Sequence, residues 1–107
     1  GEDGELFEVI DQSVDDAIAG RVIFIGDGDH RLREDYLRIL RFYRFNAWYG
    51  AGIDAEGQAA CMRQRGGLAK IASERIWKEL KRTLAAPDPS AAMEAMEEAG
   101  VLESVLP

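Results

Sequence analysis

The chain has 107 residues, the length of a single domain, and carries a formal net charge of −7 at pH 7. Apolar residues make up 47% and charged residues 31% of the sequence, a balance typical of a soluble globular protein. No apolar run approaches the roughly 20 residues that span a bilayer, and we find no secretory signal pattern. The acidic balance argues against a general nucleic-acid coat protein, and the single cysteine excludes an intramolecular disulfide.

The N-terminal part predicts a short β-type leader. Residues 5–10 and 21–25 are runs of β-branched and aromatic residues, and the second run, bounded by glycines, predicts a strand. The acidic segment 11–20 between them predicts a loop with one helical turn. Residues 26–30, "GDGDH", predict another loop whose acids can cap the element that follows.

The rest of the chain predicts a mainly α fold, a helical bundle. The predicted helices cover residues 32–49, 55–65, 74–86 and 89–99, and the start of another element follows at 101–107. Asp54, Ser73 and Asp88 are the expected N-caps, because Asp and Ser side chains accept hydrogen bonds from the first turn of a helix.

Isolated reactive residues do not indicate a catalytic site. Cys61 lies on a predicted helix with no histidine beside it, so we expect a small buried hydrophobe. His30 is the only histidine, and we expect a structural or solvated role for it. Met93 and Met96 are expected in the core.

The stretch "RLREDYLRILRFYRF", residues 31–45, holds five arginines and only two acids. At about 100° per residue, Glu34, Arg38 and Arg41 share one arc of the predicted helix, and Asp35 lies about 60° from Arg38. Aromatic and aliphatic residues occupy most of the remaining circumference, which predicts packing on most sides. An unpaired buried guanidinium costs several kcal/mol, so these arginines must be paired or must bind a ligand.

Two interpretations of this stretch follow. In the first, Glu34–Arg38 and Asp35–Arg38 are salt bridges within the helix, and the other arginines reach water. In the second, Asp35 accepts and Arg38 donates hydrogen bonds to a base edge that carries an amine next to a ring acceptor. Cytosine and adenine have such an edge, whereas guanine and uracil place a carbonyl where the amine is needed. The side chains would then act as the pairing partner of a nucleotide.

The same residues resemble a known family. Arg31, Glu34, Asp35, Arg38 and Arg41, followed by Arg44-Phe45, fit the Arg-x-x-Glu-Asp-x-x-Arg-x-x-Arg signature at the start of the helical neck of bacterial tRNA nucleotidyltransferases (CCA-adding enzymes) and poly(A) polymerases. The segment "GRVIFIGDGDHR" is similar to the last strand and loop of the catalytic head. A later neck motif is matched by Glu74, Arg75, Ile76, Glu79 and Leu80.

The resemblance implies a domain division and a set of roles. Residues 1–26 would be the tail of the head, with strand 21–25, and residues 27–107 the neck, which binds nucleotide and RNA. Asp35 and Arg38 would select the base. Glu34, Arg41 and Arg44 would support the nucleotide or orient that pair. The nucleotide-binding set is thus Glu34, Asp35, Arg38, Arg41 and Arg44, whereas Glu74, Arg75 and Glu79 would hold the neck together.

The resemblance also implies that the catalytic residues lie elsewhere. The Gly-Ser turn and the metal-binding aspartates of the family's head have no match here, so Mg²⁺ would be held by a head domain upstream. We therefore expect a segment of a longer cytoplasmic enzyme that acts with CTP, ATP and tRNA and is inactive alone. The alternatives are the neck of an ATP-specific poly(A) polymerase and a helical protein-interaction domain.

Overall fold

The computed structural model describes residues 22–24, 26–50 and 52–106. Its elements are α3 (Gly28–Glu34), α4 (Leu37–Tyr49), α5 (Ala55–Gln64), the 3₁₀ helix η2 (Arg65–Lys70), α6 (Ser73–Leu84), α7 (Ser90–Glu98) and α8 (Val101–Val105). The mainly α prediction is confirmed. None of the helices in these ranges is long and apolar enough to cross a membrane.

The predicted β-type leader is not supported. Residues 1–21, which include the runs at 5–10 and 11–20, lie outside the described residues. The predicted strand at 21–25 falls partly inside them, and residues 22–24 there are not in a strand. Val22 is nevertheless buried, and Phe24 stacks on Phe42 with 5.1 Å between the ring centroids. This segment therefore contributes to the core through its side chains.

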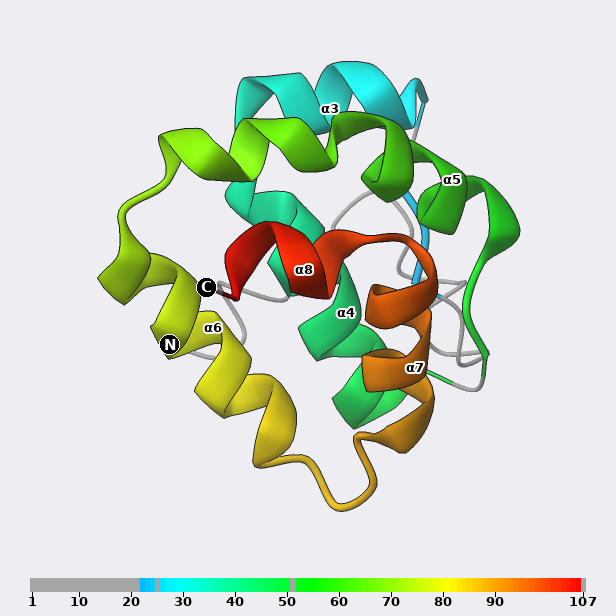
Figure 1. Ribbon diagram of the computed structural model, residues 1–107. Coiled ribbons are helices and arrows are strands. Elements are labelled where there is room, and N and C mark those ends of the chain that lie inside the picture. The colour runs from blue at the N-terminus through cyan, green and yellow to red at the C-terminus, as the bar shows by residue number, and fades with distance from the viewer. Residues whose placement is uncertain (1–21, 25, 51, 107) are drawn as a thin grey trace.

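Helix α4 lies at the centre of the bundle. Figure 1 shows α4 between α6 and α7, with α3 and α5 side by side across one end of the molecule and α8 near η2. Because neighbouring helices cover it on several sides, α4 is buried over most of its circumference. Its buried residues are Leu37, Ile39, Leu40, Phe42, Tyr43, Arg44, Phe45 and Asn46.

The prediction of one helix over residues 32–49 is wrong. A helix begins earlier, at Gly28, where the Asp27 side chain accepts a hydrogen bond from the Asp29 backbone N–H at 3.0 Å. It ends at Glu34, because Asp35 is extended at φ −159° and its Oδ1 accepts from the Leu37 N–H at 3.1 Å. This local bond gives the backbone an alternative to the helical ladder, and α4 begins only after it.

The other helix boundaries are close to those predicted. Asp54 caps α5 as expected, since its carboxylate accepts from the Gly57 N–H at 2.8 Å. Asp88 accepts from the Ser90 N–H at 3.1 Å, although α7 begins at Ser90 itself. The expected cap at Ser73 is wrong by one position, because Ser73 is the first residue of α6 and Ala72 precedes it without a side-chain bond.

The glycines near the end of α5 do not stop the chain from coiling. We expected the helix to end at Gly66 and Gly67, but after Gln64 it continues as η2 through Lys70. Gly100 does end α7, because its φ of +75° lies in the left-handed region that glycine enters without a side-chain clash.

The isolated residues behave as expected. Cys61 is fully buried, and burial raises the pKa of its thiol, so the reactive thiolate is disfavoured. Met96 is also fully buried, and Met93 packs against the same core. His30 lies exposed on α3, with its Nε2 3.4 Å from Glu34 Oε2. None of these groups contributes a nucleophile.

Gly57 marks the closest approach of α5 to α4. A Cβ there would lie 2.6 Å from the Phe42 ring, which the packed core cannot move aside cheaply. We expect Gly57→Ala to lower the free energy of unfolding by about 1–3 kcal/mol, as overpacking does. Urea denaturation measures this. Gly66→Ala is the matched control, because its Cβ would meet nothing within 4 Å; equal losses in both variants would contradict the steric explanation.

Candidate nucleotide-recognition site

The break between α3 and α4 determines how Asp35 is held. Its Oδ1 accepts from the backbone N–H of Leu37, the first residue of α4, a local bond that the sequence pattern did not reveal. The side chain lies half-buried at the junction of the two helices. One carboxylate oxygen therefore fixes the orientation of the group, and the other, Oδ2, accepts no hydrogen bond from the described part of the chain.

Arg38 is held by the end of α3. Its Nη1 donates to Glu34 Oε1 at 2.9 Å and to the Arg31 carbonyl at 2.8 Å, and 19% of the side chain is exposed. Arg38 thus satisfies both N–H groups of Nη1 and leaves Nε and Nη2 without a partner among the described residues. The hydrogen bond from Arg38 is also the main cause of the lowered pKa of Glu34.

The predicted salt bridges within this stretch are half confirmed. Glu34 pairs with Arg38, as the interpretation based on pairing required. No salt bridge joins Asp35 to Arg38 in the described part of the chain; Asp35 Oδ1 accepts from the Leu37 N–H instead. The break still leaves Asp35 and Arg38 three positions apart at the start of α4, one with an available acceptor and the other with available donors.

Arg41 and Arg44 both lie near Glu79 of α6, whereas Arg38 pairs with Glu34. Arg44 Nε lies 2.7 Å from Glu79 Oε1, and Arg41 Nε lies 3.5 Å from Glu79 Oε2. The Arg44 and Glu79 side chains are 3% and 4% exposed, so this ion pair is buried between α4 and α6. The Arg44 guanidinium also lies 4.6 Å from the centroid of the Phe45 ring.

Sequence reasoning missed Glu79 as the partner of these arginines. A signal was available, because Glu79 lies on the same helical arc as Ile76, Leu80 and Thr83, which are buried. A carboxylate at an inward position requires a buried cation. The other two residues of the later motif, Glu74 and Arg75, lie exposed on the first turn of α6.

Tyr36, the residue after Asp35, rests on η2. A Cβ at Gly67 would overlap the Tyr36 ring, so only glycine fits at this close approach. The Lys70 ammonium lies 5.5 Å from the centroid of the same ring, within the range of a cation–π contact. The contact between Tyr36 and Gly67 thereby packs η2 against the junction of α3 and α4. No sequence motif pointed to these two residues.

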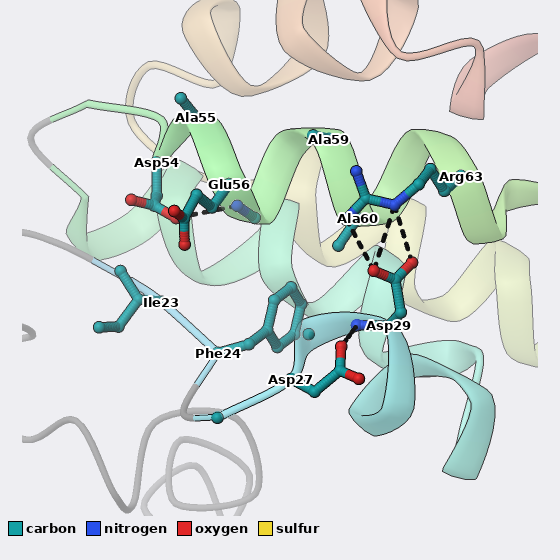
Figure 2. A pocket seen from close by; sticks show the side chains of 13 residues that line it. Ile23, Phe24, Asp27, Asp29, Asp54, Ala55, Glu56, Ala59, Ala60 and Arg63 are labelled. Carbon is teal, nitrogen blue, oxygen red and sulfur yellow. Dashed lines mark hydrogen bonds and ion pairs between the residues drawn. The ribbon is translucent and has the colours of Figure 1, made fainter.

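A separate hollow lies beside the N-terminal ends of α3 and α5. Figure 2 shows Asp27, Asp29, Asp54 and Glu56 around it, with Arg63 reaching from α5 to Asp29. Arg63 Nη2 is 2.7 Å from Asp29 Oδ2, its Nε donates to both carboxylate oxygens, and Gln64 also donates to Asp29. These bonds hold α3 against α5 and neutralise the central carboxylate of the hollow.

Comparison with known proteins places this arrangement in context. A family model described as "Probable RNA and SrmB- binding site of polymerase A" matches residues 52–107. The chain belongs to the tRNA nucleotidyltransferase and poly(A) polymerase family. Within it, the chain corresponds to the neck region. The match covers α5 to α8, including the Glu79 that holds α4.

Named relatives extend the similarity toward the N-terminus. The chain is 41% identical to the CCA tRNA nucleotidyltransferase 1, mitochondrial, of Homo sapiens over 78% of its length, and 37% identical to that of Danio rerio over 96%. It is 36% identical to the CCA-adding enzyme of Leuconostoc mesenteroides over 86% of its length. The matched segments span 20%, 24% and 23% of these relatives, respectively, so the chain covers about a quarter of their length or less.

The buried ion pair predicts a large stability effect. Glu79→Ala removes the carboxylate that lies 2.7 Å from the buried Arg44 Nε, so we expect a loss of about 3–5 kcal/mol in the free energy of unfolding. Urea denaturation gives this value. Glu74→Ala removes a carboxylate from the exposed side of the same helix, and a change within about 0.5 kcal/mol is expected. Similar small losses for both variants would show that the pair does not hold α4 to α6.

The Asp29–Arg63 pair predicts a pH dependence. The hydrogen bond from Arg63 is the main reason that the pKa of Asp29 is lowered from 3.8 to about 2. Because the folded-state pKa is depressed, the stabilisation is present above about pH 4 and is lost as the pH falls through 2. The stability difference between wild type and Asp29→Asn should therefore shrink between pH 4 and pH 2. In an Arg63→Gln background this pH-dependent difference should become clearly smaller, although Gln64 still donates to Asp29; an unchanged difference would contradict the assignment to Arg63.

Proposed function

We propose that this chain is the base-recognition neck of an RNA 3′-end nucleotidyltransferase that adds C and A residues to tRNA. The observation that carries the proposal is the half-buried pair of Asp35 and Arg38. Asp35 keeps one carboxylate oxygen available and Arg38 keeps Nε and Nη2, while their other atoms are fixed by protein bonds. The names of the relatives, which are tRNA nucleotidyltransferases and CCA-adding enzymes, support the same function.

The proposed recognition follows from hydrogen-bond chemistry. Asp35 Oδ2 accepts from the exocyclic amine of cytosine or adenine, and Arg38 donates to the adjacent ring nitrogen or carbonyl. Guanine and uracil would place a carbonyl against the carboxylate, so that two acceptors face each other in a site with limited access to water. An unpaired group of this kind costs about 1–3 kcal/mol, which sets the expected discrimination.

The surrounding residues position this pair. Glu34 fixes the Arg38 guanidinium, and the Leu37 N–H fixes the Asp35 carboxylate. Arg41 and Arg44 act on the pair indirectly. Their ion pairs with Glu79 fix α4, which carries Arg38, against α6. In this proposal the two arginines orient the pair through the helix that bears it.

The chemical step belongs to another part of the protein. Among the described residues, no group of three or more His, Cys, Asp or Glu side chains could hold a metal ion. We propose that Mg²⁺, the phosphoryl transfer and most contacts to the CTP or ATP triphosphate lie in a catalytic head of a longer cytoplasmic chain. The neck alone would then select bases without transferring nucleotides.

A second candidate is the neck of an ATP-specific poly(A) polymerase. The description of the matching family model names polymerase A, which favours this alternative. The Asp35–Arg38 pair suits adenine as well as cytosine, so the two candidates differ in the nucleotides used and not in the chemistry of this pair.

Nucleotide addition by the longer protein that contains this segment tests the proposal. tRNA lacking its 3′ CCA end is incubated with each of the four nucleotides, using wild type and Asp35→Asn. Asn caps helices as well as Asp does, so the fold should be retained. Its amide can donate as well as accept, so the preference for C and A over G and U in kcat/KM should fall by about 1–3 kcal/mol. Asp35→Ala, which also removes the bond to the Leu37 N–H, should lose the preference too.

Arg33→Ala is the matched control, because Arg33 is exposed on α3 two residues before Asp35. It should leave base preference unchanged. Addition of C and then A by wild type supports the CCA-adding function, and tails of A alone would favour the poly(A) alternative. If the folded wild-type protein adds no nucleotide, the proposal fails and a helical protein-interaction domain remains.

A further inference from the structure

The outward side of α6 is strongly basic. The helix buries Ile76, Glu79, Leu80 and Thr83 against the core, so its opposite side faces solvent. Arg75, Lys78 and Lys81 are exposed and Arg82 is half-buried. Glu74 is the one exposed acid of the helix, since Glu79 is turned inward to the arginines of α4. We call the surface formed by Arg75, Trp77, Lys78, Lys81 and Arg82 the α6 basic face.

This face contrasts with the acidic surface of α7 and α8. Helices α7 and α8 contain no lysine or arginine, and their exposed positions include Glu94, Glu97, Glu98 and Glu103. In Figure 1, α6 runs along the side of α4 opposite to α7. Helix α6 thus carries four cations and two acids, one of them buried, whereas α7 and α8 together carry four acids and no cation. Such a separation attracts a polyanion to one side of the molecule.

Exposed aromatic rings lie on and beside the α6 basic face. Trp77 is 52% exposed, and the Lys81 ammonium lies 5.9 Å from the centroid of its ring. Trp48, from the end of α4, is 42% exposed, and its indole N–H donates to the Arg82 carbonyl at 2.8 Å. Trp48, Tyr49 and Arg82 line a small hollow between the two helices. Large rings in these positions offer flat surfaces to a planar partner.

The combination favours RNA over a protein partner. Cations that follow one surface, with exposed aromatic rings between them, are the features by which proteins bind single-stranded nucleic acid through phosphate contacts and base stacking. Protein–protein interfaces, in contrast, are depleted in lysine at their core. Lys78 and Lys81, at the middle of the exposed side of α6, do not suit a buried protein contact.

We propose that the α6 basic face binds the RNA substrate, with Lys78 and Lys81 on backbone phosphates and Trp77 stacked on a base. This inference rests on the proposed function and deepens it, because it assigns the surface that would hold the RNA whose 3′ end is extended. Glu79 lies on the inner side of the same helix and fixes it to α4. RNA held on α6 would thus keep a defined position relative to the Asp35–Arg38 pair.

Binding of tRNA lacking its CCA end to the longer protein tests this assignment, with fluorescence anisotropy measured over a range of KCl concentrations. Lys78→Ala/Lys81→Ala should weaken binding roughly tenfold and should reduce the slope of log Kd against log salt by about 0.7 for each lysine, the value for single strands. Trp77→Ala should weaken binding by about fivefold or more, and Trp77→Phe should restore part of it because a ring remains.

The matched control is Ala91→Glu/Ser104→Glu, which lowers the net charge by the same amount on the exposed surface of α7 and α8. If this control weakens binding as much as the lysine variant, the effect is one of overall charge and the assignment fails. Unchanged affinity and salt slope in the lysine variant would also overturn it, and would leave α6 as a contact for another part of the protein. Circular dichroism and urea denaturation confirm that each variant is folded.

Failure of this inference is distinguishable from failure of the proposed function. In nucleotide addition, the lysine and Trp77 variants should raise KM for tRNA and leave the choice of C and A unchanged, whereas Asp35→Asn should change the choice. A change of base preference in the α6 variants would contradict a role confined to RNA binding. If wild type adds no nucleotide, the anisotropy measurement still decides whether α6 binds RNA.

Discussion

The buried ion pair between Glu79 and the arginines of α4 is the interaction on which the arrangement depends. Burying a carboxylate is costly unless a cation meets it, and Arg44 meets Glu79 at 2.7 Å inside the protein. This pairing, with the buried Ile76 and Leu80 beside Glu79, sets which side of α6 faces α4. It therefore fixes the inner and outer sides of α6 at once, and with them the direction in which its lysines project.

The break before α4 adds a second constraint at the other end of the same helix. A continuous helix would have placed Asp35 within the regular backbone ladder, with its whole carboxylate projecting from one turn. In the structure one carboxylate oxygen accepts from the Leu37 N–H at the start of α4, and the other accepts no hydrogen bond from the described residues. The structural role and the proposed recognition role thus meet in a single side chain, and Glu34 holds Arg38 in a similar way.

Local sequence patterns were sufficient for most helices and for two of their caps. Asp54 and Gly100 have the expected roles because hydrogen bonds and backbone geometry within a few residues determine them. The break at Asp35 was missed because helix periodicity is continuous through it, and only a competing side-chain bond interrupts the backbone. The Glu79 partnership was missed because it joins helices distant in sequence. The sequence motif identified these residues, but only the packing of the helices shows which of them lie at the surface and which are buried.

The contact between Tyr36 and Gly67 carries an evolutionary consequence. Because the ring occupies the space that any side chain at position 67 would need, the two positions form one steric unit despite their separation in the sequence. A relative with a side chain at the position of Gly67 must have a smaller residue in place of Tyr36, or must shift η2 outward. The two positions are thus expected to vary together, and the identity of one indicates how closely η2 approaches the start of α4.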